Sequence, residues 1–133
     1  MVTHDARRAF LALAIWLFCT PSGRAQDRVV YSKVGTASYY GAELVGQRTA
    51  SGARYDPAQL TAAHPTLPLG AEVTVVALAS GRQVDVRITD RGPFTGGRDI
   101  DLSQRAAEKL GIVKRGVAKV RITATEEQLE QAD

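Results

Sequence analysis

The chain has 133 residues, of which 44% are hydrophobic and 23% are charged, and its formal net charge is +3 at pH 7. This length suits one domain and is too short for two of ordinary size. The composition is that of a globular protein, which excludes a disordered chain and a collagen-like or coiled-coil rod. The basic excess is small and scattered, so binding to nucleic acid is not expected. A single cysteine excludes an intrachain disulfide.

Residues 1–25 have the pattern of a secretory signal peptide. Arg7 and Arg8 precede an unbroken apolar run over residues 9–19, and small residues at 23 and 25 stand where a signal peptidase cleaves. The run is too short to span a bilayer comfortably, which favours cleavage over the alternative of an uncleaved anchor. We therefore expect an exported protein, in the periplasm or cell envelope, with no membrane anchor after cleavage.

Cys19 raises the alternative of lipoprotein processing, in which a cysteine becomes the lipidated first residue. That processing requires a small residue before the cysteine, and Phe18 stands there. Lipid anchoring at Cys19 is therefore not expected. Cleavage after Ala25 leaves a part without cysteine, which must be stabilised by its core alone and is long enough for a small barrel or sandwich.

Three segments follow the expected signal peptide: a lead-in over 26–34, one domain over 35–124 and an acidic tail over 125–133. Four acidic residues and no basic residue lie in the tail, where Leu129 is the one core-forming side chain. We expect this tail to be frayed or to form a short solvated helix. We also expect the protein to be a monomer.

The first half of the domain contains short strands separated by loops. Residues 35–40 are rich in strand formers and predict a first strand. Residues 41–55 contain three glycines among polar residues, which indicates loops with at most a short strand. Residues 60–64 form a candidate short strand, closed by Pro65 and Pro68.

A β-hairpin, a helix and a last strand make up the second half. The β-branched run over 72–78 and the strictly alternating run over 82–89 flank a tight turn, which predicts a hairpin. Asp101 and Ser103 supply a cap for one helix, which Gly111 ends. Strand alternation returns over the sequence VAKVRIT, at 117–123. About six short strands and one helix predict a small, mainly β barrel.

Five motifs give the domain a resemblance to a known family. They are GTASYYG at 35–41, RTASG at 48–52, LTAAHPTLP at 60–68, ITDRGPF at 88–94 and GRDIDLS at 97–103. In this order, they resemble the rare lipoprotein A family, whose members have a double-psi β-barrel domain. The resemblance covers residues 35–124 and implies a six-stranded double-psi β-barrel with one short helix.

The resemblance also implies contact with peptidoglycan glycan strands. Characterised members of the family are endolytic lytic transglycosylases, which cut between N-acetylmuramic acid and N-acetylglucosamine and leave 1,6-anhydro ends. Other proteins with this barrel, such as expansins, bind or loosen wall polysaccharides without evident cleavage. Because fold does not settle activity, a glycan-binding barrel is the alternative.

Asp90 is the candidate catalytic acid and base. It ends an apolar alternating strand and opens a glycine-proline loop, where a side chain can face a cleft. One carboxyl group is enough for lytic cleavage, because the C6 hydroxyl of the sugar itself attacks the anomeric carbon. Asp90 matches the aspartate assigned as catalytic in the family. The alternative is a turn residue paired with Arg91.

His64 matches a family position implicated in activity. It precedes Pro65, so we expect extended backbone in a loop. There the ring would orient Asp90 or bind a sugar hydroxyl, and the alternative is a partly exposed histidine without a role.

Ala53 departs from the family pattern, which usually has glutamate here. Alanine has no proton to donate and binds no sugar hydroxyl. If that glutamate is the acid in the family, this chain is an inactive glycan-binding barrel; if Asp90 is the acid, reduced activity survives.

Four further side chains are candidates for binding the glycan. Tyr40 and Phe94 offer flat rings that stack on sugar faces, whereas the alternative for each is packing in the core or within its own loop. Arg91 and Arg98 offer positive charge for peptidoglycan carboxylates, whereas the alternative is pairing with neighbouring aspartates.

No cofactor is expected, and no metal site. Outside the leader, His64 stands alone, so no cluster of histidine and cysteine ligands is present. The glycines at 92, 96 and 97 lack the spacing and the lysine of a phosphate-binding loop.

Overall fold

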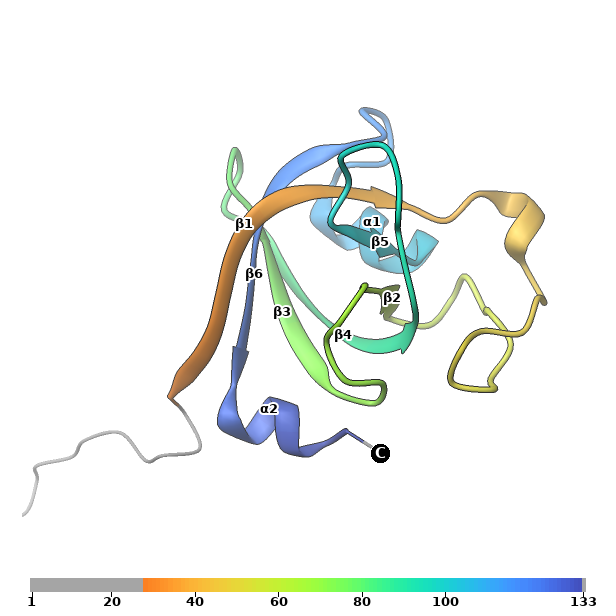
Figure 1. Cartoon of the computed structure of the whole chain (residues 1–133). Helices are drawn as coiled ribbons and strands as arrows, with labels where there is room; N and C mark the ends of the chain where they lie inside the picture. Colours follow the sequence, from red (N-terminus) through yellow and green to blue (C-terminus); the bar gives the residue numbers. More distant parts are fainter. Residues whose placement is uncertain (1–27, 133) are drawn as a thin grey trace, which may run out of the picture.

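The computed structural model describes residues 28–132, which form a closed six-stranded barrel (Figure 1). The expected signal peptide, its cleavage site and Cys19 lie outside these residues. The strands follow one another around the barrel in the order β1-β5-β2-β4-β3-β6. Their bounds are Val29–Tyr39 for β1, Thr61–Ala63 for β2, Glu72–Ala77 for β3, Gln83–Asp90 for β4, Ile100–Leu102 for β5 and Ala118–Thr125 for β6. The predicted six-stranded, mainly β barrel is confirmed.

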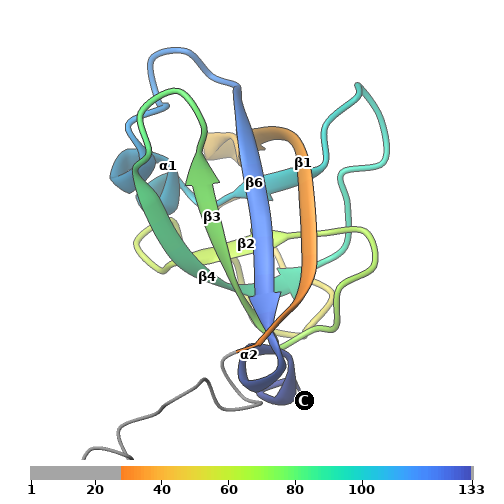
Figure 2. The same cartoon turned by 90° about the vertical axis from the view of Figure 1, so that its left-hand side faces the viewer.

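Four long strands make one continuous wall (Figure 2). The predicted hairpin pairs β3 with β4 antiparallel, β3 also pairs with β6, and β6 pairs with β1. Alternate residues of β3, β4 and β6 point into the barrel and are buried, as period-two alternation requires. Their side chains form the core together with those of β5 and the helix after it: Val73, Val75, Val84, Val86, Ile88, Ile100, Leu102, Leu110, Val120 and Ile122.

The two three-residue strands close the barrel. β5 pairs parallel with β1 and antiparallel with β2, and β2 pairs parallel with the end of β4. The last residues of β1, β2 and β4 therefore lie next to one another, with β5 between β1 and β2. This junction carries the polar side chains described below.

Two α-helices are present among residues 28–132: the predicted helix after Ser103, and a short helix in the acidic tail, which is one of the two alternatives expected there. Helix α1 (Gln104–Leu110) begins after Ser103, whose side chain accepts a hydrogen bond from the backbone of the first turn, and ends at Gly111 with φ 74°. Ser103 is therefore the predicted cap, but Asp101 is not, because it lies within β5. Helix α2 (Glu126–Glu130) follows β6 directly, and a capping box formed by Thr125 and Gln128 stabilises its start.

Strand β1 begins at Val29, six residues before the predicted start at residue 35. The first half of this strand is mostly exposed. Its residues therefore do not alternate between apolar and polar, which is the pattern that predicts a strand. Its hydrogen bonds to β6, which begin at Val29 and Thr125, supply the stabilisation instead.

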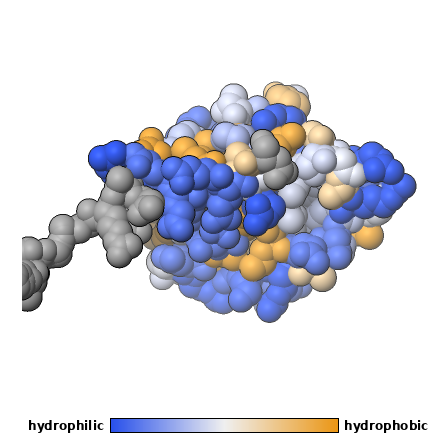
Figure 3. All heavy atoms as spheres, turned by 90° about the horizontal axis from the view of Figure 1, so that it is seen from below, coloured by the Kyte–Doolittle hydropathy of each residue, from blue (hydrophilic) through white to orange (hydrophobic). Residues whose placement is uncertain are grey.

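Polar side chains cover most of the face seen from below in Figure 1, and its apolar residues form small separate patches (Figure 3). Within residues 28–132, the helices are too short and too polar to cross a membrane. A short 3-10 helix at Ala42–Leu44 interrupts the long loop between β1 and β2.

Candidate functional site

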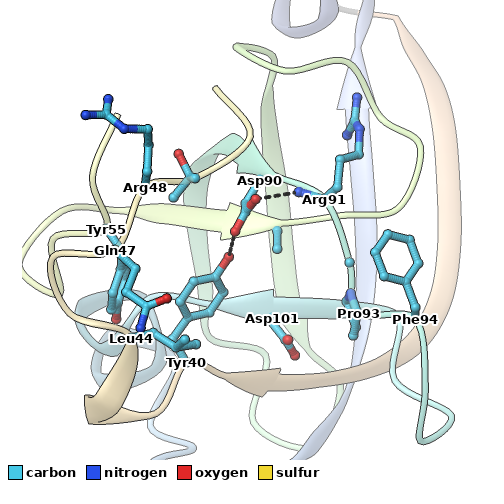
Figure 4. A pocket seen from close by; sticks show the side chains of 13 residues that line it. Tyr40, Leu44, Gln47, Arg48, Tyr55, Asp90, Arg91, Pro93, Phe94 and Asp101 are labelled. Atoms are coloured by element: carbon cyan, nitrogen blue, oxygen red, sulfur yellow. Dashed lines mark hydrogen bonds between the residues drawn. The ribbon is translucent and has the colours of Figure 1, made fainter. Parts of the chain in front are cut away.

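A pocket of about 230 Å³ opens where the ends of β1, β2 and β4 meet (Figure 4). Tyr40 directly follows β1, β2 contributes Ala63, β4 contributes Asp90, and β5 contributes Asp101. The loop between β1 and β2 forms one side and the loop after β4 the other. Its remaining lining residues are Leu44, Gln47, Arg48, Thr49, Tyr55, Arg91, Gly92, Pro93 and Phe94.

A β-bulge directs Asp90 toward this pocket. Ala62 pairs with Ile88, but the next residue of β2, Ala63, pairs with Asp90, so Thr89 is the extra residue of the bulge. Ile88 points into the core and is fully buried, whereas Asp90 is only partly buried. Bulges of this kind redirect side chains at the ends of strands.

Three donors hold the Asp90 carboxylate. The backbone N–H groups of Ala50 and Arg91 each donate to Oδ1 at 2.9 Å, and the Tyr40 hydroxyl donates to Oδ2 at 2.6 Å. Hydrogen bonds to a carboxylate are stronger than those between neutral groups. They fix the orientation of this side chain within the pocket.

Tyr40 keeps its proton and acts as a donor. Burial raises the pKa of the Tyr40 hydroxyl well above its ordinary value, and the hydrogen bond to Asp90, the negative charge of Asp90 and that of Asp101 raise it further. The Tyr40 ring packs against the Tyr55 ring, with 4.6 Å between the ring centroids. The phenol is therefore held in place at both ends.

His64 lies behind the pocket rather than in it. The ring is 4% exposed, and Nδ1 accepts hydrogen bonds from the backbone N–H groups of Thr66 and Leu67, both at 3.1 Å. The Tyr31 hydroxyl lies 3.3 Å from Nε2. Burial lowers the pKa of His64 to about 4, and the charges of Lys33 and Arg91 act in the same direction. The neutral ring therefore carries its proton on Nε2.

The link between His64 and Asp90 runs through the backbone. The His64 N–H donates to the Asp90 carbonyl oxygen at 3.1 Å. The Arg91 guanidinium donates from Nη1 to the carbonyl oxygens of His64 and Leu67, at 3.0 and 2.7 Å. Figure 4 shows this guanidinium turned away from Asp90, although Arg91 lines the pocket. His64 and Arg91 thus stabilise the turn over residues 64–67 beside the pocket.

The other two candidates lie at the edge of the site. Phe94 is 76% exposed on the rim of the pocket. Arg98 lies outside the lining, and its Nη1 donates to the Ser38 hydroxyl at 2.9 Å and to Oδ1 of Asp101 at 3.2 Å. Of the predicted site residues, the structure brings Asp90, Tyr40, Arg91 and Phe94 to the pocket, whereas His64 and Arg98 lie outside its lining.

Asp101 lines the pocket, whereas the sequence predicted that it caps a helix. The available signal was the alternation of Ile100, Asp101 and Leu102, in which two buried apolar residues flank one polar residue. Three residues are too few for this alternation to predict a strand with any force.

Ala53 lines a neighbouring hollow of about 300 Å³ and not the pocket that contains Asp90. The two share Thr49 and Tyr55. Between them lies the loop over 48–54, which is held by hydrogen bonds from the Thr49 backbone and hydroxyl to the Ala53 carbonyl oxygen. No group of three or more histidine, cysteine or carboxylate side chains suited to a metal is found within residues 28–132.

A family model described as "Lytic transglycolase" matches residues 32–122, which is most of the described chain. The chain belongs to this family. The resemblance to the RlpA double-psi barrels is likewise confirmed by curated relatives. Over 96 residues, the chain is 51% identical to the endolytic peptidoglycan transglycosylase RlpA of Pseudomonas aeruginosa PAO1, a match that covers 72% of this chain and 28% of that protein.

The RlpA of Haemophilus influenzae is 50% identical over 107 residues, with 80% of this chain and 37% of that protein covered. The chain thus spans well under half the length of these family members.

Among solved structures, the Streptomyces papain inhibitor has a TM-score of 0.58 at 27% identity, covering 72% of this chain and 96% of that one. An expansin of Clavibacter michiganensis in complex with cellohexaose has a TM-score of 0.54 at 18% identity, covering 71% and 50%. At this identity the expansin supports the shared fold alone.

Proposed function

We propose that this barrel is an endolytic peptidoglycan transglycosylase that cleaves the bond between N-acetylmuramic acid and N-acetylglucosamine and leaves 1,6-anhydro ends. The observation that carries the proposal is the Asp90 carboxylate, oriented by three donors in an open pocket. Support comes from the curated family members that carry this activity in their names and are about 50% identical.

In the proposed reaction, the carboxyl group of Asp90 gives its proton to the glycosidic oxygen as the bond from that oxygen to the anomeric carbon breaks. The C6 hydroxyl oxygen of the muramyl sugar then bonds to the same carbon, and its proton passes to Asp90. No water is consumed, and Asp90 ends as it began. Oδ1 accepts hydrogen bonds from two fixed backbone N–H groups, whereas Oδ2 accepts one from the Tyr40 side chain. Because Oδ2 is the less occupied oxygen, it is the one that carries the proton and meets the glycosidic oxygen.

The other predicted site residues take supporting roles in this proposal. Phe94 on the rim and the Tyr40 ring stack on sugar faces. His64 and Arg91 act as positioning residues, since they fix the turn that is hydrogen-bonded to the backbone of Asp90. Arg98 acts through Asp101, with which it forms an ion pair. The reaction as written needs no cofactor.

A glycan-binding barrel without catalysis is the second candidate, and Ala53 is the observation that favours it. Family members usually carry a glutamate at this position. If that carboxylate is required, the chain binds glycan and does not cut it. Ala53 lines the hollow beside the Asp90 pocket, so an extended glycan strand that crosses both would pass over it.

The test is to incubate residues 26–133 with purified sacculi and to measure anhydro-muramyl ends by mass spectrometry. Asp90→Asn keeps the shape of the side chain and removes the proton that it transfers. Asp85→Asn, an exposed acid on the same strand, is the matched control. We expect product from the wild type and from Asp85→Asn, and none from Asp90→Asn.

An Ala53→Glu variant separates the two candidates. Product from Ala53→Glu alone, with none from the wild type, would overturn the proposed activity in favour of the binding barrel. Product from Asp90→Asn at the wild-type rate would remove Asp90 from its role.

We further propose that the protein acts as a monomer in the periplasm or cell envelope, exported by its signal peptide and without a lipid or membrane anchor. Cell fractionation with and without a Cys19→Ser substitution tests the anchoring. Size-exclusion chromatography of residues 26–133 tests the monomer.

A further inference from the structure

A row of paired residues crosses four neighbouring strands at the pocket. Ser38 of β1 pairs with Asp101 of β5, Asp101 pairs with Ala63 of β2, and Ala63 pairs with Asp90 of β4. Paired residues on adjacent strands direct their side chains to the same face. Two carboxylates therefore face one opening, two strand spacings or about 10 Å apart between their Cα atoms.

Ala63 is the residue between them, and its methyl group lines the pocket. A larger side chain at this register position would fill the space between the two carboxylates. Figure 4 shows Asp90 and Asp101 on separate strands of this opening, with the Tyr40 ring beside them. The pocket thus leaves room for a sugar ring over Ala63.

One oxygen of Asp101 is anchored and the other is free. The Ser38 hydroxyl and the Arg98 guanidinium both donate to Oδ1. Within residues 28–132, Oδ2 takes part in none of the hydrogen bonds or ion pairs of this side chain. The Asp101 side chain is 16% exposed and is one of the side chains that line the pocket.

The negative charge of Asp101 acts on the Tyr40 hydroxyl, which also lines the pocket. It is one of the causes that raise the pKa of the Tyr40 hydroxyl, which is itself bonded to Asp90. The transition state of glycosidic cleavage carries positive charge at the anomeric carbon. A carboxylate already oriented by protein donors stabilises such charge without reorganisation.

We propose that Asp101 is a second catalytic carboxylate, whose Oδ2 faces the anomeric carbon across Ala63 from Asp90 and stabilises the positive charge that develops there. This inference rests on the proposed transglycosylase function. Asp101 takes no proton in the reaction: the proton cycle belongs to Asp90 alone. Arg98 and Ser38 are positioning residues, because they act only through Oδ1 of Asp101.

The experiment compares Asp101→Asn with Asp99→Asn in the protein over residues 26–133. Asparagine at 101 keeps an acceptor for Ser38 and Arg98 and removes the charge. Asp99 lies two residues earlier, pairs with Lys33 outside the pocket and provides the same charge change. We expect Asp101→Asn to slow the formation of anhydro-muramyl ends about 100-fold, the size of effect seen when one preorganised group is lost. Asp99→Asn should stay within about twofold of wild type, because it lies outside the pocket.

A binding measurement makes the test independent of turnover. The probe is a cationic iminosugar analogue of N-acetylglucosamine, with neutral N-acetylglucosamine as its reference, titrated by calorimetry. Loss of one close charge pair corresponds to about tenfold or more in affinity. We expect Asp101→Asn to weaken iminosugar binding by that factor and to leave binding of the neutral sugar unchanged. Should Asp101→Asn fail to fold by circular dichroism, Asp101→Ser replaces it.

The outcomes separate this inference from the proposed function. If the wild type forms anhydro ends and Asp101→Asn forms them at the Asp99→Asn rate, the role of Asp101 is overturned and the proposed function stands. If the wild type forms none but iminosugar binding depends on Asp101, the charge-stabilising site stands and the proposed function fails. Absence of both effects overturns both.

Discussion

Tyr40 and His64 are the two neutral, titratable side chains on either side of Asp90, and burial keeps each of them uncharged. Burial raises the pKa of the Tyr40 hydroxyl and lowers that of the His64 ring, because in both cases it disfavours the charged form. Tyr40 therefore donates to Asp90 as a phenol. His64 accepts two backbone hydrogen bonds as a neutral ring.

We predict that Tyr40→Phe lowers kcat about tenfold, because Asp90 loses the donor at Oδ2 that orients it. The phenylalanine ring keeps the contact with Tyr55, so the loss of stability should be limited to that of one hydrogen bond to a carboxylate, about 2 kcal/mol. The measurement is the initial rate of anhydro-end formation over a range of substrate concentrations.

Tyr39→Phe is the matched control. The Tyr39 hydroxyl donates to the carbonyl oxygen of Val113 at 2.8 Å, outside the pocket. Its loss should cost about 1 kcal/mol of stability and leave kcat unchanged. Equal values of kcat in the two variants would show that the bond to Asp90 does not contribute to the reaction.

At the scale of elements, the sequence predicts those parts whose signal is local. Strict alternation and a tight turn predicted the β3–β4 hairpin, and the cap residue with a terminal glycine predicted α1. The first half of β1 and the whole of β5 were missed, because pairing with distant strands stabilises them rather than their own pattern. Propensity is a weak guide where tertiary pairing decides.

The same limit explains what was predicted of the site. Asp90 was placed correctly at the end of a strand because the alternation of β4 and the glycine-proline sequence after it are local. The proximity of Asp101 to Asp90 depends on β2 lying between their strands. The burial of His64 depends likewise on Tyr31, 33 residues earlier. Such contacts are properties of the closed barrel and have no signature in adjacent residues.

We predict that Ser103→Ala destabilises the protein by about 2 kcal/mol. Ser103 is 1% exposed, and its hydroxyl donates to the Gln59 carbonyl oxygen at 2.6 Å while it accepts from the backbone of Ala106 at 3.2 Å. Alanine leaves both groups unsatisfied at the junction of the long loop and α1. Urea unfolding measures the free energy.

Thr125→Ala provides the comparison at α2, where the cap lies at the partly exposed end of the molecule. We expect a loss of about 1 kcal/mol or less there. If Thr125→Ala lost more free energy of unfolding than Ser103→Ala, this would contradict the interpretation that Ser103 joins α1 to the barrel and that α2 is peripheral.

At the scale of the whole molecule, the pocket exists only when the barrel is closed. The row of Ser38, Asp101, Ala63 and Asp90 draws on four strands from across the chain. Conditions that unfold the barrel globally therefore abolish the site as a unit. Acid lowers the stability of the barrel, because His64 is buried and uncharged.

We predict that the free energy of unfolding falls as the pH is lowered from about 6.5 to about 4. The pKa of His64 is lowered from its ordinary value of 6.5 to about 4 in the folded protein, so within this window the unfolded chain binds more protons. The contribution of His64 to stability is thus complete above pH 6.5 and is lost as the pH falls. The loss is at most about 3.5 kcal/mol, since one pKa unit corresponds to about 1.4 kcal/mol. Asp99 has a lowered pKa too, chiefly through the hydrogen bond from Thr36, but its contribution is lost only below its ordinary value of 3.8.

His64→Asn isolates this contribution. The Oδ1 of asparagine occupies the same place relative to Cγ as Nδ1 of histidine, so it can accept the N–H groups of Thr66 and Leu67 without a group that titrates in this range. Urea unfolding of both proteins at pH 7.0, 5.5 and 4.5 should show a falling free energy for the wild type and a nearly flat one for His64→Asn. Parallel losses in the two proteins would assign the acid sensitivity to other groups, because the only difference between them in this window is the charge that the buried ring must take up.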